Sequence, residues 1–356
     1  MATTISSRFA VVPRQRWRQQ QQQPSVLSQW HAVVFYFVLV FADHMQNPYE
    51  YKLYYYNNLE QKAIAQIYAI GALGGCFADL WGRSFAKRVG WKLSAALLLA
   101  LLMQSCLMKN TDDLLTLMIS KILAKICVLT LFPLAVGQFS ARTKPSETAT
   151  MIGNGFIGIV SGVTGSLLCD VIYFDCFIIF YIAAFVLGAL FLFHWLAPPP
   201  QSIREFLEPY RSDRVVTLAV LSSEAGLWCC STVVEAYWTP LVNPSKMNVG
   251  LLYALYCLFH VFGGCFFRVT RVVGATPRYT LTLACLLAAI GMFFVAAAMP
   301  LYPDSVLVIV MAMLAFHFAL GLWGVALRKL RDCVPLSPLN ETYCPQRGYA
   351  WSGPCC

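Results

Sequence analysis

Charged side chains are scarce in this chain. Only 12% of its 356 residues are Asp, Glu, Lys or Arg, whereas 58% are hydrophobic, and a soluble globular domain carries about 25% charged residues. The hydrophobic residues also gather in long continuous runs, unlike the alternating strands of a membrane β-barrel. The composition therefore excludes an ordinary water-soluble protein and predicts an all-α integral membrane protein.

Signatures of common enzymes are missing as well. The chain contains no HExxH, GxSxG or GxxxxGK[ST] motif, so neither a metalloprotease, a serine hydrolase nor a nucleotide-driven pump is indicated. The 14 cysteines lack paired CxxC spacing. His260 and His317 lie in apolar runs without the spacing of metal ligands. We expect no enzyme activity, no cofactor and no metal site.

The apolar runs are near 20 residues long, which is enough to cross roughly 30 Å of hydrocarbon as a helix. They predict about ten transmembrane helices, over residues 28–46, 61–80, 90–109, 113–138, 150–169, 174–197, 214–242, 248–267, 278–299 and 305–327.

The distribution of cations predicts the orientation. With the N-terminus in the cytosol, 20 of the 26 lysines and arginines fall on the cytosolic side and only four on the other side. Positive residues accumulate on the cytosolic side of membrane proteins, so both termini are expected there. The formal net charge of +9 is explained by these anchors and the lipid bilayer, and no nucleic-acid partner is needed. Plasma membrane is assumed as the default location.

A short repeat divides the chain into two parts. The sequence GGCF ends the second expected span at residues 74–77 and the eighth at residues 263–266, as a duplicated helix bundle would show. A Pro-rich stretch separates the parts. We expect a disordered cytosolic tail over residues 1–27 and a six-helix bundle over residues 28–197. A cytosolic linker follows at residues 198–213, then a partial four-helix bundle at residues 214–327 and a second cytosolic tail at residues 328–356.

The stretch GCFADLWGR, residues 75–83, resembles the loop signature between the second and third spans of the major facilitator superfamily. Gly75, Asp79, Gly82 and Arg83 match it, while Leu80 replaces the usual Arg. The resemblance implies a gating role for these four residues.

Two further stretches resemble the molybdate-anion transporter family within that superfamily. They are DHMQNPYEYKLYYYNNLEQKAIAQIY, residues 43–68, like its first external segment, and residues 212–242, like its seventh span. The family implies twelve core spans, whereas only ten are expected here, with the last two missing. Its fourth span usually contains an Arg, where this chain has Lys121. In the superfamily the loop Asp braces against the eleventh span, so either the C-terminal bundle is truncated or Asp79 has another partner.

Lys121 and Lys125 are the clearest candidates for substrate contact. They stand i and i+4 on one helical face of an expected span, and a charge in a membrane span is costly and usually faces a polar cavity. Two like charges one turn apart need an anion or nearby carboxylates. The alternatives are that one lysine is neutral or snorkels, or that both pair with acidic groups on other helices.

Glu224 and Glu235 are separated by about three helical turns, so both can face one cavity. They could bind a coupling proton or neutralise Lys121 and Lys125, and Asp43 is assigned to the same cavity.

The Tyr-rich PYEYKLYYY at residues 48–56 is expected at the outer interface. Gly155, Gly158, Gly162 and Gly165 predict close helix packing along the fifth span.

These patterns favour a secondary active transporter that moves a small inorganic oxyanion by alternating access. By resemblance the anion is molybdate, and a proton is a candidate coupling ion. The alternatives are a transporter of the same fold for another solute, such as a sugar or an organic ion, and a truncated membrane protein that does not transport. The sequence gives no oligomeric state.

Overall fold

The computed structural model describes residues 26–143, 147–172, 175–196, 233–234, 248–301 and 306–332. Every regular element within these ranges is a helix, which confirms the all-α prediction. The elements are α2 (Val26–Tyr56), α3 (Gln61–Val89), α4 (Trp91–Met108), α5 (Leu114–Thr143), α6 (Glu147–Ser166), the π-helix η1 (Leu167–Val171), α7 (Phe177–Leu196), α9 (Val249–Val272), α10 (Pro277–Leu301) and α11 (Val306–Asp332).

Seven of the described helices contain a stretch long and apolar enough to cross a membrane. Nine of the ten expected spans correspond to described helices. The seventh expected span, residues 214–242, lies outside the described residues except for Val233 and Val234.

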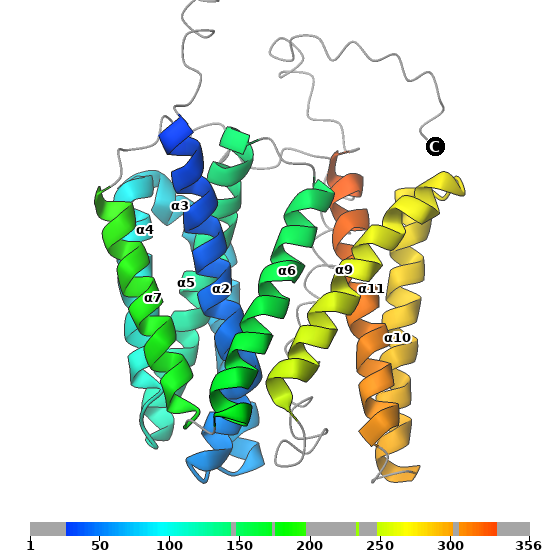
Figure 1. Ribbon diagram of the computed structural model, residues 1–356, viewed down its shortest axis with the longest axis horizontal. Helices are drawn as coiled ribbons and strands as arrows, with labels where there is room; N and C mark the ends of the chain where they lie inside the picture. The colour runs from blue at the N-terminus through cyan, green and yellow to red at the C-terminus, as the bar shows by residue number, and fades with distance from the viewer. Residues whose placement is uncertain are drawn as a thin grey trace, which may run out of the picture.

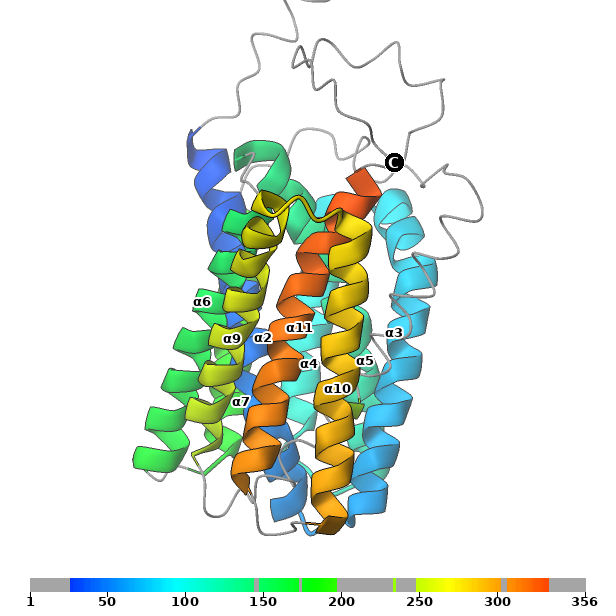
Figure 2. The ribbon, with the colours of Figure 1, turned by 90° about the vertical axis from the view of Figure 1, so that its right-hand side faces the viewer.

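The helices form two groups (Figure 1). Helices α2 to α7 pack together, with α3 on α5, α4 on α7 and α2 on α6, whereas α10 packs on α11 and α11 on α9. The two groups meet mainly along α6 and α9, which lie side by side in both views (Figure 2). The start of α2 and the end of α11 lie at one end of the bundle. The opposite end, where α2 stops and α9 starts, is called the Tyr56 end below.

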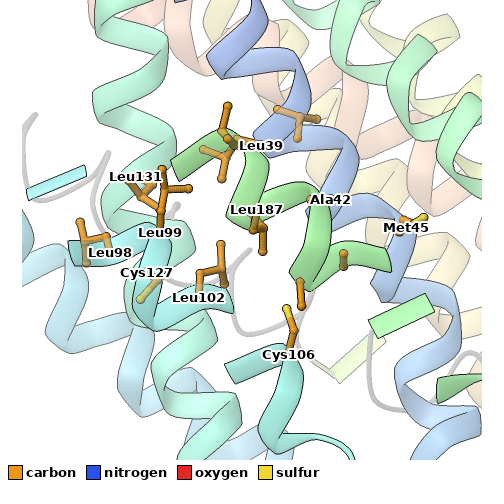
Figure 3. Packing of buried hydrophobic residues seen from close by; sticks show 14 of the residues in the cluster. Leu39, Ala42, Met45, Leu98, Leu99, Leu102, Cys106, Cys127, Leu131 and Leu187 are labelled. Carbon is orange, nitrogen blue, oxygen red and sulfur yellow. The ribbon is translucent and has the colours of Figure 1, made fainter. Parts of the chain in front are cut away.

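The largest core lies inside the first group. Leu39 of α2, Leu99 of α4, Leu131 of α5 and Leu187 of α7 are fully buried against one another (Figure 3). Helices that are apolar all round need no polar face in a membrane, so their association depends on this close packing. The core joins α2 to α4, α5 and α7.

Local chemistry sets several helix ends. The Asp113 carboxylate accepts bonds from the hydroxyl and the backbone N–H of Thr116 at the start of α5, and these bonds hold the pKa of that exposed carboxyl below its ordinary value. Asn248 caps α9 by accepting from the N–H of Leu251. Gly90 alone connects α3 to α4 with a φ of +87°, a conformation that glycine adopts readily.

Helix α2 extends ten residues past residue 46, where the first expected span ended. Proline removes a backbone donor and usually ends a helix, and Pro48 lies two residues beyond the expected end. The structure continues the helix through Pro48 to Tyr56, as membrane helices often do when neighbours satisfy the freed backbone groups. Tyr49, Tyr51 and Tyr54 are buried, so these three side chains do not contact lipid and water as expected, whereas Tyr55 and Tyr56 at the end of the helix are exposed.

Helices α9 and α11 touch through their backbones. A Cβ atom on Gly263 would collide with the carbonyl group of Phe318, and one on Gly321 would collide with the carbonyl of His260. Gly324, one turn further along α11, has open space where a Cβ would stand. Close approach of these two helices therefore requires the first two glycines but not the third.

We predict that Gly263→Ala lowers the melting temperature of the detergent-purified protein by several degrees, because overpacking costs about 1–3 kcal/mol. Gly324→Ala is the matched control and should melt at or above the wild-type temperature, since alanine favours a helix over glycine. The measurement is thermal unfolding followed by intrinsic tryptophan fluorescence. Equal melting temperatures for the two variants would contradict the backbone contact.

Candidate functional site

A buried carboxylate on α2 binds two lysines from different parts of the first group. The Glu50 Oε1 atom lies 2.9 Å from Lys109 Nζ, and Oε2 is paired with Lys121 Nζ. Tyr54, one turn along α2, donates its hydroxyl to Oε1 at 3.0 Å. Each of the four side chains is buried. Glu50, Tyr54, Lys109 and Lys121 are called the carboxylate–lysine cluster.

Polar and aromatic groups surround the two ammonium groups. Gln46 Oε1 accepts from Lys109 Nζ at 3.3 Å and also from the Cys106 thiol at 3.3 Å. Lys121 Nζ lies 4.2 Å from the ring centroid of Tyr68, and Lys109 Nζ lies 5.1 Å from that of Phe180. A cation over an aromatic face is attracted by the ring. Within the cluster, two buried lysines therefore pair with the same carboxylate.

Lys121 is thus placed in a polar site, as the sequence indicated, and its partner is an acidic group on another helix. One alternative stated for the lysine pair was pairing with acidic groups on other helices. For Lys121 the structure shows such a group, Glu50 of α2. Lys125 lies one turn further along α5 and Asp43 two turns before Glu50 on α2; both are partly exposed. Glu224 and Glu235, expected to face the same cavity, lie outside the described residues.

Glu50 and Lys109 were missed by the sequence analysis. Glu50 was assigned to an external segment because the first span was ended at residue 46, and Lys109 was counted as a cation at the end of a span. A signal for the longer helix exists in the sequence. Tyr49 and Leu53 continue the buried stripe of α2 at i, i+4 spacing, and this places Glu50 inside the bundle.

The four expected gating residues lie in a helix. Gly75, Asp79, Gly82 and Arg83 all belong to α3, which runs to Val89, so the signature forms no loop here. A Cβ on Gly82 would lie 2.5 Å from Thr130 Oγ1, and one on Gly75 would lie 2.9 Å from Leu129 Cδ1. The two glycines therefore allow α3 to pack closely on α5. The side chains of Asp79 and Arg83 are outside the described part of the structure.

The glycine stripe of α6 forms the contact between the two groups of helices. A Cβ on Gly158 would lie 2.5 Å from Cys257 Sγ, and one on Gly162 would lie 2.6 Å from the Gly250 carbonyl oxygen. Gly165 instead faces Tyr49 of α2, with 2.5 Å from its Cβ position to Cε2. Close packing is what the stripe predicted.

Two further sets of polar contacts lie near the Tyr56 end. His44 Nδ1 and Tyr253 Oη are 2.6 Å apart, which joins α2 to α9. The Asp170 carboxylate of η1 accepts from Tyr49 Oη at 2.8 Å and from Lys52 Nζ at 3.1 Å. This second ion pair is more exposed than the carboxylate–lysine cluster, since 13% and 11% of the two side chains are accessible, compared with about 5%.

Comparisons with known proteins agree with this architecture. A family model described as sugar transporters with twelve transmembrane segments, a branch of the major facilitator superfamily, matches residues 13–196, which is just over half of the chain. A curated relative from Xenopus laevis named "Molybdate-anion transporter" is 23% identical over 346 residues, covering 83% of this chain and 70% of the relative. These matches confirm the resemblance inferred from the sequence motifs.

Solved structures with the same fold include two transporters. A mutant of the nucleoside transporter NupG has a TM-score of 0.59 at 11% identity and covers 84% of this chain and 81% of its own. A D-xylose–proton symporter has a TM-score of 0.55 at 14% identity, with 85% and 80% covered. At these identities the likeness concerns the fold alone. Because the family model matches more than half of the chain and the helix arrangement agrees with it, the chain belongs to this twelve-segment transporter family of the major facilitator superfamily and is a multi-pass membrane transporter of that type.

Proposed function

We propose that the protein is a secondary active transporter of a small oxyanion, with molybdate as the preferred substrate. The observation that carries the proposal is the carboxylate–lysine cluster, in which two buried lysines pair with one carboxylate inside the membrane bundle. Lys125 adds a third ammonium group one turn from Lys121 on α5. Two buried lysines and a partly exposed one so close together favour an anionic solute.

The free-energy cost of placing lysines inside a membrane supports an anionic solute. A lysine at the centre of a membrane helix costs about 2.5–3.5 kcal/mol on insertion scales, and a neutral solute would gain little from several of them. A tetrahedral oxyanion can accept hydrogen bonds from ammonium and hydroxyl groups at the same time, and such charge-assisted bonds are the strong ones. The name of the Xenopus laevis relative points to molybdate among the oxyanions.

Transport is proposed to occur by alternating access between residues 28–197 and 214–327. The close α6–α9 packing supports a model in which one group of helices rocks against the other while its interior stays packed. We place both ends of the chain in the cytosol and the protein in the plasma membrane. The cation distribution supports the cytosolic placement of the ends, as does the position of the start of α2 and the end of α11 at one end of the bundle (Figure 1).

A neutral solute is the second candidate. It is favoured by the description of the matching family model as sugar transporters, and the D-xylose–proton symporter shows that this fold accommodates a sugar. Charge separates the two candidates, because a sugar needs hydrogen-bonding groups and no net positive site.

We predict that cells expressing the chain take up labelled molybdate faster than cells with an empty vector, and that Lys125→Gln lowers the uptake rate about tenfold or more, equivalent to about 1.4 kcal/mol. The loss is expected because a cation facing the anion is removed without changing the length of the side chain greatly. Lys62→Gln, at an exposed position at the start of α3, is the matched control and should keep the wild-type rate. Wild-type uptake equal to that of the empty vector would reject the proposal.

Competition separates the two solute classes. Excess unlabelled sulfate should reduce the initial rate of molybdate uptake, because it has the same charge and tetrahedral shape. D-xylose and a nucleoside at the same concentration should leave the rate unchanged, since neither offers negative charge to the lysines. The reverse pattern, with inhibition by sugar and none by sulfate, would identify a neutral solute as the substrate.

A further inference from the structure

Two cysteine side chains meet where α6 is connected to α7. Cys169 lies in η1 and Cys176 lies directly before α7, and their thiol groups form a hydrogen bond with each other. Both side chains are buried in the largest core. We propose that this thiol pair is a redox site, which is oxidised to a disulfide that joins η1 to the start of α7.

The backbone holds each cysteine in place. The Ile172 N–H donates to the Leu167 carbonyl at 3.0 Å, and this π-helical bond encloses Cys169. On the other side of the loop, the Cys176 carbonyl accepts from the Ile179 N–H at 3.2 Å in the first turn of α7. A disulfide forms only between cysteines whose backbones stand at a suitable separation. Thiols already in hydrogen-bond contact need only a small shift to form the S–S bond of about 2.05 Å.

A cation lies beside the pair. The Lys52 ammonium group interacts electrostatically with both sulfurs, and a neighbouring cation favours the thiolate, which is the reactive form of cysteine. The carboxylates of Asp170 and Asp175 act in the opposite direction. Lys52 therefore offsets two negative groups that would otherwise disfavour ionisation of the thiols.

The oxidant required is a disulfide of the glutathione type. One ionised thiol of the pair attacks a sulfur of oxidised glutathione, which forms a mixed disulfide and releases one glutathione thiolate. The second cysteine then attacks the protein sulfur of the mixed disulfide, forms the bond between Cys169 and Cys176, and releases the second glutathione. The two protein thiols lose two electrons and two protons, and both glutathione molecules leave as thiols.

The position of the pair favours oxidation. Asp170, the residue after Cys169, is hydrogen-bonded to Tyr49 and Lys52 near the end of α2, so the pair lies near the Tyr56 end. With both ends of the chain in the cytosol, as proposed above, the Tyr56 end faces away from the cytosol. Disulfides form and persist in such oxidising compartments.

Burial separates formation of the bond from its later protection. Val171, Ile172 and Asp175 of the connecting loop are exposed, whereas both sulfurs are covered in the folded protein. Oxidation is therefore expected while the chain folds, before the loop packs on α2. Once formed, the buried disulfide is shielded from reductants.

The bond would strengthen the interior of the first group of helices. Fixing Cys169 also fixes the neighbouring Asp170, whose carboxylate binds Tyr49 and Lys52 of α2. The disulfide thus holds the connection between α6 and α7 against α2. This inference goes beyond the proposed function, because it depends on the orientation of the chain and not on the solute.

The test measures the oxidation state of the full chain made in cells. Cells expressing it are lysed in denaturant with excess N-ethylmaleimide, which blocks free thiols, and the digested protein is analysed by mass spectrometry without reduction. We expect a linked pair of peptides containing Cys169 and Cys176, with neither cysteine alkylated. Alkylation of both cysteines in most molecules would overturn the inference.

Cys106 and Cys127 are the internal control. They are buried in the same core (Figure 3) and interact electrostatically, but the Cys106 thiol donates to Gln46 at 3.3 Å. Both should carry N-ethylmaleimide. A disulfide between them as well would indicate unspecific oxidation and would also overturn the inference.

Thermal stability gives a second readout. Detergent-purified wild type, treated with dithiothreitol until mass spectrometry shows both thiols, should melt several degrees below the oxidised protein, because a disulfide restricts the unfolded chain. Cys169→Ser should melt at one temperature with and without this treatment, and Cys127→Ser should keep the shift. Equal melting temperatures of oxidised and reduced wild type would contradict the stabilising role. Neither readout involves molybdate, so loss of molybdate uptake would reject the proposed function and leave these results unchanged.

Discussion

The ion pairs of Glu50 with Lys109 and Lys121 constrain the rest of the first group of helices. They connect the last two turns of α2 to the residue that caps α4 and to α5. Removing one partner of a buried ion pair costs about 3–5 kcal/mol, because the remaining charge is left without compensation. The register of α2 against its neighbours is therefore set by charge, and the surrounding leucines and tyrosines pack around that register.

The contact between the two groups of helices is of a different kind. It consists of glycines on α6 facing Gly250, Ala254 and Cys257 on α9, and Tyr253 of α9 is hydrogen-bonded to His44 and Asn47 of α2. Small residues allow close approach with few interlocking side chains. A transporter in which one group moves against the other as a rigid unit needs strong contacts inside a group. Between the groups it needs a surface of small residues.

Charge also connects the architecture to the proposed transport. Buried cations are unfavourable in an empty membrane protein, and Glu50 pairs with two of them. Under the proposed function, the lysines of this site would stabilise an incoming anion. Stability of the empty state and affinity for the solute thus depend on the same three side chains, which explains why a costly arrangement can be retained.

The all-α membrane fold and the family follow from the sequence alone, because long apolar runs, cation bias and short motifs depend only on neighbours along the chain. It did not determine the length of α2, since Pro48 normally ends a helix and only packing against other helices carries the backbone through it. For the same reason it missed Glu50 and Lys109 and took part of α3 for a loop. Which carboxylate meets which lysine is a long-range contact, separated here by 59 and 71 residues, and only the tertiary structure decides it.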